Sequence, residues 1–328
     1  MPRFVAVGAG RMGRGIAIAF AYAGHRIAVV DLRERTSDAW AALRAEAEVE
    51  VRASLGSLAQ LGAIGTEQAA AIAERIEYVD AAGAPAALAE AELVFEGVTE
   101  TLEAKREAFT RIGRDCRADA ILASTTSSIP VTSIAAFVPQ PNRFLNVHWL
   151  NPAYLIPVVE LSVHAGTDAA VVTRCKALME SIGKVPVVCG PAPGYIVPRL
   201  QALVMNEAAR MIEEGAATAE EIDKATRFGM GLRFAAIGVV EFIDFGGSDI
   251  LHHASREMAA ALDAGRYRAP DIVGRMVEGG RLGVKSGAGF YDYAGRDIAA
   301  YRRDVLARTL AQLEHAGLWR PAADQTLS

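Results

Sequence analysis

The first third of the chain alternates short apolar runs with amphipathic stretches. The segment RFVAVGAG is an apolar run that ends in glycines, RMGRGIAIAFAYAGH carries small and apolar residues at helical spacing, and RIAVVD is a second apolar run. A strand, a glycine turn, a helix and a second strand within about thirty residues form a βαβ unit, which implies a parallel sheet. We therefore predict an α/β fold built on a doubly wound parallel sheet.

The pattern up to residue 190 continues with elements that extend this sheet. Further strands are predicted at 92–98, 120–125, 144–150, 157–162 and 184–190. Helices are predicted at 38–61, 67–76 and 168–182, and the first two would form a helical excursion from the sheet.

The pattern becomes helical after the segment GPAPG at 190–194, whose glycines and prolines mark a turn. Helices are predicted at 197–214, 219–228, 249–264, 270–278 and 297–316. A chain of 328 residues is long enough for two separate cores. The sequence thus predicts two domains, residues 1–189 with the parallel sheet and an all-helical C-terminal domain of residues 190–328.

Composition and charge favour work on a small molecule. The 34 Lys and Arg residues are scattered and the formal net charge is −5, so no basic patch for nucleic acid or an anionic membrane is predicted. No uncharged run approaches the roughly 20 residues of a membrane span. The three cysteines lack C-x-x-C spacing, which favours neither disulfides nor a metal site and fits a reducing compartment such as the cytoplasm.

A glycine-rich turn lies between the first predicted strand and helix, and it matches G-x-G-x-x-G with the residues Gly8, Ala9, Gly10, Arg11, Met12 and Gly13. In this context backbone N–H groups and the helix N-terminus can face a pyrophosphate, although a turn that serves only helix packing is an alternative. Asp31 ends the second strand, where a carboxylate accepts hydrogen bonds from a ribose 2′-hydroxyl. We therefore predict a Rossmann-type domain that binds NAD, with Arg33 and Arg35 leaving NADP open.

Three kinds of side chain suited to alcohol chemistry lie in or directly after strands of the predicted sheet. Seven hydroxyl residues occupy Ser124 to Ser133, His148 stands in NVHWLNP, and Glu160 follows twelve positions later in PVVELS. In a parallel sheet, groups at adjacent strand ends converge on the ligand crevice. A histidine whose tautomer is fixed by a carboxylate can take the hydroxyl proton as hydride leaves. A structural His–Glu pair fits the spacing equally well.

The combined motifs resemble those of the L-3-hydroxyacyl-CoA dehydrogenase family. They are VAVGAGRMGRGIA, FEGVTETLEAKREAF, STTSSIPVTSIA, RFLNVHWLNP, VVELS, PGYIVPRL and GVKSGAGFYDY, in the family's order and nearly its spacing over residues 3 to 294. The resemblance implies that Ser127 binds the substrate and nicotinamide, that His148 is the general base and that Glu160 orients it. It also implies that Glu100, Lys105 and Lys285 lie against the cofactor, and that the helical domain forms a homodimer.

The chain departs from the family pattern at Pro198. The family places there an asparagine that contacts the substrate acyl group, whereas proline has no side-chain amide and no backbone N–H to donate. Proline is also common in the first turn of a helix, so its presence need not have functional meaning. The predicted substrate-binding residues are therefore Ser127 and, at the position of the family asparagine, Pro198.

The predicted reaction is oxidation of a 3-hydroxy group to a 3-oxo group with NAD, on a substrate such as 3-hydroxybutyryl-CoA. The chain has no lysine before Lys105, although family members often hold CoA phosphates with lysines after the second strand. A small free hydroxy acid, as in gulonate and carnitine dehydrogenases, or another alcohol or aldehyde is therefore an alternative. A catalytically silent dinucleotide-binding protein is a third hypothesis.

Overall fold

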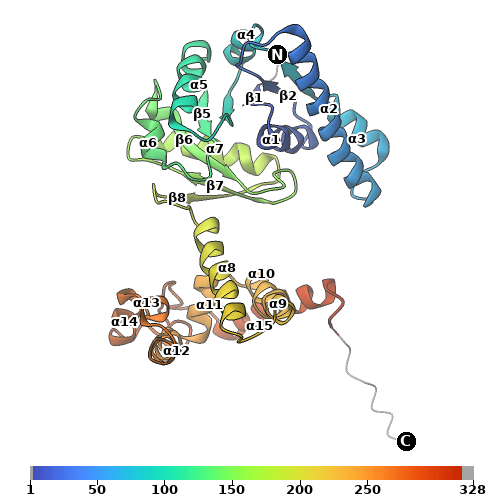
Figure 1. The fold of residues 1–328 in the computed structure, drawn as a ribbon. Helices are drawn as coiled ribbons and strands as arrows, with labels where there is room; N and C mark the ends of the chain where they lie inside the picture. The colour runs from blue at the N-terminus through green and yellow to red at the C-terminus, as the bar shows by residue number, and fades with distance from the viewer. Residues whose placement is uncertain (1–2, 320–328) are drawn as a thin grey trace, which may run out of the picture. The chain divides into compact units, whose positions relative to one another are not determined.

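A single eight-stranded sheet organises the first part of the chain in the computed structural model, which describes residues 3–319 (Figure 1). The strands lie in the order β3-β2-β1-β4-β5-β6-β7-β8. Their bounds are β1 Phe4–Val7, β2 Ile27–Val30, β3 Ile76–Val79, β4 Leu93–Glu96, β5 Ile121–Ser124, β6 Phe144–Trp149, β7 Val158–Ser162 and β8 Val185–Cys189. The order reverses between β1 and β4, which is where ligands bind in doubly wound sheets.

The strand pairing is parallel throughout except between β6 and β7. In that antiparallel pair, His148 lies directly opposite Glu160. The expectation that these residues meet at the ends of parallel strands was therefore wrong in its geometry. They meet as cross-strand partners, whose Cβ atoms lie about 5 Å apart in an antiparallel ladder.

Helices cover both faces of the sheet. Those of the first unit are α1 Arg11–Tyr22, α2 Ser37–Gln60, α3 Thr66–Ala73, α4 Ala84–Ala89, α5 Leu102–Asp115, α6 Val131–Ala135 and α7 Ala169–Ser181. The side chains of Thr36 and Thr101 accept backbone N–H groups at the starts of α2 and α5, which satisfies donors that a helix start leaves free. Apolar side chains of α1, α2, α3 and α7 pack on one face, and those of α4, α5 and α6 pack on the other.

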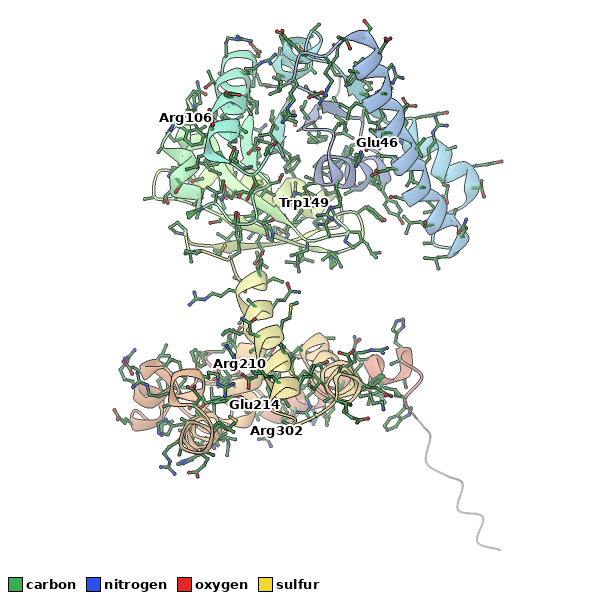
Figure 2. The ribbon with its side chains drawn as sticks, in the orientation of Figure 1. Glu46, Arg106, Trp149, Arg210, Glu214 and Arg302 are labelled. Carbon is green, nitrogen blue, oxygen red and sulfur yellow. The ribbon has the colours of Figure 1, made fainter. Side chains whose placement is uncertain are left out.

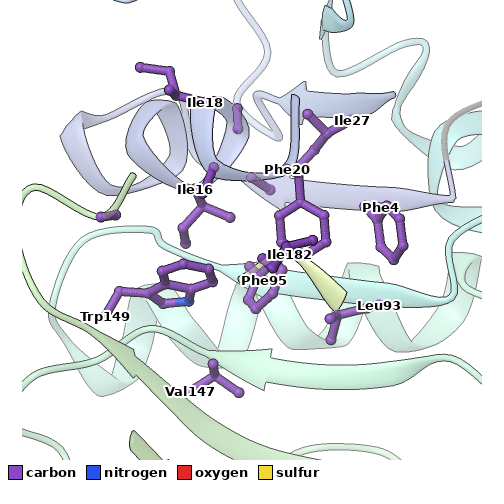
Figure 3. Close-up of a cluster of buried hydrophobic side chains, with 14 of the residues drawn as sticks. Phe4, Ile16, Ile18, Phe20, Ile27, Leu93, Phe95, Val147, Trp149 and Ile182 are labelled. Carbon is purple, nitrogen blue, oxygen red and sulfur yellow. The ribbon is translucent and has the colours of Figure 1, made fainter. Parts of the chain in front are cut away.

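Aromatic residues form the centre of the core on the α1 face (Figure 3). Phe20 lies with its ring centroid 4.6 Å from that of Phe4 and 5.6 Å from that of Phe95, and Trp149 meets Phe95 edge-on at 5.7 Å. Figure 2 shows Trp149 among the packed side chains of this unit, with Glu46 and Arg106 at its surface. Because side chains alternate along a strand, burying Trp149 on this face turns the neighbouring His148 to the other.

The second unit is helical, as predicted for the C-terminal domain. Its elements are α8 Val197–Glu213, α9 Ala219–Lys224, a π-helix at Ala225–Gly231, α10 Leu232–Ala236, α11 Val239–Gly246, α12 Ser248–Ala261, α13 Ala264–Tyr267, α14 Asp271–Glu278 and α15 Ile298–His315. The two compact units divide after Val204, within α8, whereas the sequence analysis places the domain boundary at residue 189. No helix within residues 3–319 is long and apolar enough to cross a membrane.

Several described elements are missing from the sequence predictions, among them β3, α4, α5, α10 and α11. The predicted helix at 67–76 runs into the first residue of β3, because the alanine-rich pattern gives no stop before the strand. The helix ends instead at Ala73, and Ile76 pairs with Ile27 of β2. Pairing with an existing strand edge thus overrides local propensity at this point.

Candidate active site

The glycine turn has a different physical requirement at each of its three glycines. Gly8 has φ +105°, a left-handed conformation, and a Cβ there would lie 2.6 Å from the carbonyl oxygen of Gly97. A Cβ on Gly13 would lie 2.0 Å from the carbonyl oxygen of Gly8, so α1 approaches the turn closely. Gly10 has no atom within 4 Å of the Cβ position, which leaves its backbone open to a ligand. This division of roles fits a pyrophosphate at the N-terminus of α1.

A cavity of about 410 Å³ joins this turn to the ends of β2 and β4. Its lining includes Gly8, Ala9, Gly10, Asp31, Arg33, Arg35, Gly97, Val98 and Thr99. Asp31 is 7% exposed, and its carboxylate accepts the backbone N–H of Arg33 at 3.1 Å and the Nε–H of Arg35. The cavity therefore lies at the switch point of the sheet, with the carboxylate that the sequence assigns to a ribose on its wall.

Arg11 and Met12, the two residues between Gly10 and Gly13, have side chains in different environments. Arg11 lines a neighbouring cavity of about 280 Å³ with Asn151 and Tyr154. Met12 packs against the hydrophobic core beneath α1. Their predicted contact with the cofactor would therefore come from the backbone of the turn.

His148 and Glu160 form a buried hydrogen-bonded pair. His148 Nδ1 lies 2.8 Å from Glu160 Oε2, and the two residues are 3% and 0% exposed. When Nδ1–H donates to the carboxylate, the free lone pair of the imidazole is on Nε2. Within residues 3–319 no hydrogen bond involves Nε2. The pair can therefore present an oriented base to a ligand.

The second oxygen of Glu160 is held by the start of α8. Glu160 Oε1 accepts the backbone N–H groups of Ile196 and Val197, both at 2.8 Å. These donors satisfy the carboxylate away from the histidine, so one oxygen remains directed at Nδ1. Tyr195, directly before them, stacks on the imidazole with ring centroids 4.6 Å apart. The sequence analysis includes this segment in the motif PGYIVPRL but assigns no role to Tyr195, although an aromatic residue after the Pro-Gly turn was a visible signal.

Glu100 organises the hydroxyl-rich loop after β5. Glu100 Oε1 accepts the hydroxyl of Thr126, the backbone N–H of Ser127 at 3.1 Å and the hydroxyl of Ser128 at 3.0 Å. Thr126 Oγ1 in turn accepts the backbone N–H of Ile129 at 2.9 Å. The Ser127 side chain is exposed, and its hydroxyl makes no hydrogen bond in the described part of the chain. Of the two exposed serines of this loop, Ser127 is thus the one whose hydroxyl makes no hydrogen bond among the described residues.

Lys105 is part of a buried ion pair, not a surface charge. Its Nζ lies 2.9 Å from Glu96 Oε1 and 3.2 Å from Glu100 Oε2, and Lys105 and Glu96 are 1% and 0% exposed. Ser124 Oγ donates to Glu96 Oε2 at 2.7 Å. Glu96 was not among the predicted site residues, because its pairing with Lys105 depends on how α5 packs against β4. The ion pair fixes the end of β4 to α5, and the next residues after β4, Gly97 and Val98, line the switch-point cavity.

The pKa of Glu100 is lowered from its ordinary value. Burial alone would raise it, but the hydrogen bond from Thr126, the positive charge of Lys105 and the hydrogen bond from Ser128 outweigh the burial. Glu100 therefore accepts its hydrogen bonds as a carboxylate at neutral pH.

The side chains of the remaining predicted residues make none of these hydrogen bonds or ion pairs. Pro198 is the second residue of α8, where its missing N–H costs no helical hydrogen bond. Lys285 belongs to the second unit, where its Nζ lies 2.6 Å from Asp249 Oδ1. Between residues 3 and 319 no group of three His, Cys, Asp or Glu side chains could hold a metal ion.

A switch-point cavity bordered by a glycine turn and a ribose-facing carboxylate is the architecture of dinucleotide-binding proteins. Two family descriptions together match most of the chain. They are the 3-hydroxyacyl-CoA dehydrogenase NAD binding domain over residues 4–192 and the 3-hydroxyacyl-CoA dehydrogenase C-terminal domain over residues 194–293. The chain therefore belongs to the 3-hydroxyacyl-CoA dehydrogenase family, and it is an NAD-dependent dehydrogenase acting on hydroxyl groups. The predicted family, fold class and cofactor are confirmed.

Similar proteins cover nearly the whole chain. A 3-hydroxybutyryl-CoA dehydrogenase of Mycobacterium tuberculosis is 34% identical over 289 residues, 88% of this chain and 96% of the relative. A 5-formyl-3-hydroxy-2-methylpyridine 4-carboxylate 5-dehydrogenase of Mesorhizobium japonicum is 29% identical over 308 residues, 93% of this chain and 95% of the relative. The crystal structure of a 3-hydroxyacyl-CoA dehydrogenase from Archaeoglobus fulgidus superposes with a TM-score of 0.74 at 30% identity, over 97% of this chain and 100% of that one.

Proposed function

We propose that this protein oxidises the 3-hydroxy group of a 3-hydroxyacyl-CoA, such as 3-hydroxybutyryl-CoA, to a 3-oxo group. The observation that carries the proposal is the buried His148–Glu160 pair, whose Nδ1 contact leaves Nε2 as the basic atom. Residues 1–189 would bind NAD, and residues 190–328 would contribute substrate binding and dimerisation.

In the proposed reaction the substrate loses one hydride and one proton. Bound NAD supplies the acceptor for the hydride that leaves the substrate carbon with its electron pair. His148 Nε2 takes the hydroxyl proton as the carbon–oxygen double bond forms, and Glu160 stabilises the imidazolium that results. Ser127 donates its free hydroxyl to the reacting oxygen and so holds it toward the base.

The NAD site would use the residues that border the switch-point cavity. Backbone N–H groups of the glycine turn would hold the pyrophosphate, and Asp31 would accept a ribose hydroxyl. Glu100 and Lys105 would act next to the cofactor by fixing the loop that carries Ser127. Placement of Lys285 against the cofactor is also part of the proposal.

The test is NADH formation by purified protein with NAD and L-3-hydroxybutyryl-CoA, compared with free 3-hydroxybutyrate at matched concentration. We expect turnover of the thioester, and a loss of about a hundredfold to ten-thousandfold in kcat for His148→Ala with unchanged NAD affinity. His253→Ala, an exposed histidine of α12, is the matched control. Near-normal turnover by His148→Ala would refute the assignment of the base.

A second candidate function is dehydrogenation of a free acid or an aromatic aldehyde. Two observations favour it: Pro198 replaces the family asparagine, and the Mesorhizobium relative is a dehydrogenase of a pyridine carboxylate. Preference for gulonate, carnitine or 5-formyl-3-hydroxy-2-methylpyridine 4-carboxylate over the thioester would replace the first proposal with this one. Turnover of none of these substrates would extend the search to other alcohols and aldehydes.

We also propose a homodimer in a reducing compartment such as the cytoplasm. No residue of α8 is buried, and the helix exposes the apolar side chains of Leu200, Leu203, Val204, Met205 and Ile212. An apolar helix face of this kind is typical of a subunit interface. Cys116, Cys175 and Cys189 are all free thiols, which supports the reducing compartment.

A further inference from the structure

Tyr195 is the one described non-glycine residue with a left-handed backbone conformation, at φ +47°. Such a conformation is rare for a bulky side chain, and it persists only where surrounding contacts enforce it. Residues held in this way cluster at functional sites. The contacts of Tyr195 show what this conformation achieves.

The ring of Tyr195 covers one face of the His148 imidazole. The two rings are nearly parallel, with an interplanar angle of 11° and centroids 4.6 Å apart, and Tyr195 is 6% exposed. The Nδ1 contact to Glu160 fixes one edge of the imidazole, but a single hydrogen bond leaves the ring free to rotate about it. The stacked ring removes that freedom.

The hydroxyl of Tyr195 connects two elements on either side of the base. It donates to the carbonyl oxygen of Thr126 at 2.6 Å and accepts the amide N–H of Asn146 at 3.1 Å. Thr126 directly precedes Ser127, and Asn146 lies two residues before His148 on the same face of β6. One phenol thus joins the strand of the base to the loop of the reacting hydroxyl.

The backbone after Tyr195 holds the third member of the group. The left-handed turn at Tyr195 is followed by the N–H groups of Ile196 and Val197, and both donate to Glu160 Oε1. The segment from Tyr195 to Val197 therefore contacts His148, Glu160 and the Thr126 carbonyl at the same time.

We propose that Tyr195 is a positioning residue, which fixes the plane of the His148 imidazole and its place relative to Ser127. This inference rests on the proposed function, in which these two side chains act on one substrate oxygen. A purely space-filling role would require only the ring, because Phe would supply the same burial. The two hydrogen bonds of the hydroxyl are what distinguish a tyrosine here.

The kinetic test compares Tyr195→Phe and Tyr195→Leu with Tyr293→Phe, a buried tyrosine of the second unit, as the control. We expect Tyr195→Phe, which keeps the stacking but removes both hydrogen bonds of the hydroxyl, to lose about tenfold or more in kcat. Tyr195→Leu should lose about a hundredfold, because small misplacements of catalytic groups have effects of that size. KM and the Kd for NADH should change less than about twofold. Equal kcat for wild type and both variants would overturn the inference.

A readout without turnover separates this inference from the proposed function. In nitrogen-15 spectra of the histidine side chains, the ring-current shift of His148 should persist in Tyr195→Phe and disappear in Tyr195→Leu, where the Nδ1–H signal should also broaden. If wild type turns over no hydroxyacyl-CoA, the proposed function fails, and these spectra still decide whether Tyr195 fixes the imidazole. An unchanged His148 spectrum in Tyr195→Leu would overturn the inference even if wild type is active.

Discussion

At the scale of single residues, the site depends on how each carboxylate oxygen is used. Glu160 divides its two oxygens between the imidazole and two backbone N–H groups, so no lone pair directed at the histidine is diverted. Glu100 accepts hydrogen bonds from the loop after β5 with Oε1 and contacts Lys105 with Oε2. In both cases a carboxylate arranges another group, and the group that would touch substrate is the histidine or Ser127.

Glu160→Gln should therefore lower both activity and stability strongly, although glutamine and glutamate have nearly the same shape. The amide can accept on one side only, so its NH₂ group must face either the imidazole, which forces the wrong tautomer, or the two backbone N–H donors. We expect a loss of about a hundredfold or more in kcat and about 1–3 kcal/mol in the free energy of unfolding from unpaired buried donors. Initial rates and urea unfolding measure the two effects, with the exposed Glu257→Gln as the control. A fully active Glu160→Gln enzyme is incompatible with the arrangement.

Glu100 makes stability depend on pH in a defined direction. Its pKa is lowered from the ordinary value of 4.5, so the ionised form stabilises the fold above that value, and the contribution is lost as pH falls through the lowered pKa. Because the side chain is partly exposed, we expect Glu100→Gln to lower Tm by no more than about 2 °C at pH 7. The difference should shrink as pH falls below 4.5 and vanish once pH is below the lowered pKa. Calorimetric scans of wild type and Glu100→Gln between neutral and acidic pH measure this Tm difference, with the exposed Glu34→Gln as the control. A Tm difference that grows as pH falls would contradict the prediction.

At the scale of elements, the sequence predicted what periodicity and spacing encode. The βαβ unit, the glycine turn and the interval between His148 and Glu160 were all visible before the fold. Strand direction was not visible, because an apolar run is the same in a parallel or an antiparallel pair. The contacts of Tyr195 and Glu96 were also hidden, since they depend on which loops the sheet brings together. Only the family resemblance selected Ser127 from the seven hydroxyl residues as the predicted substrate-binding residue, because all seven fit the spacing.

A substitution at the start of α8 tests which substrate the protein prefers. Pro198→Asn restores the side-chain amide of the family and an N–H that the first helical turn leaves free, so the fold should tolerate it. If the substrate is an acyl-CoA thioester, the added hydrogen bond should raise kcat/KM about tenfold. The control is Pro270→Asn, at the start of α14. A fall in kcat/KM for the thioester would show that the pocket is built around proline.

At the scale of the whole molecule, the exposed apolar side chains of α8 form the surface through which we propose that two copies associate. A helix of 17 residues with none of them buried contributes little to a monomer, whereas a second copy would remove its apolar side chains from water. Oligomeric state is therefore where the proposed homodimer is tested.

Leu203→Glu places a charge on that surface and should convert the proposed dimer to monomer in sedimentation velocity at micromolar concentration. Burying an unpaired carboxylate in an apolar interface costs several kcal/mol, enough to dissociate most dimers. Leu203 is 66% exposed, and the matched control is Leu61→Glu, at an 81% exposed leucine at the end of α2. A wild type that sediments as a monomer would contradict the proposed homodimer directly.

Because β6 and β7 are antiparallel, the contact between His148 and Glu160 does not depend on the length of the loop that joins the two strands. His148 and Glu160 stay opposite each other as long as the two strands keep their register, whatever the intervening loop contains. The interval of twelve is thus a property of one loop and not a requirement of the reaction. Inserted residues at the exposed Leu155 would leave the pair intact. Distant relatives with longer loops can therefore share this chemistry while escaping any search that fixes the interval.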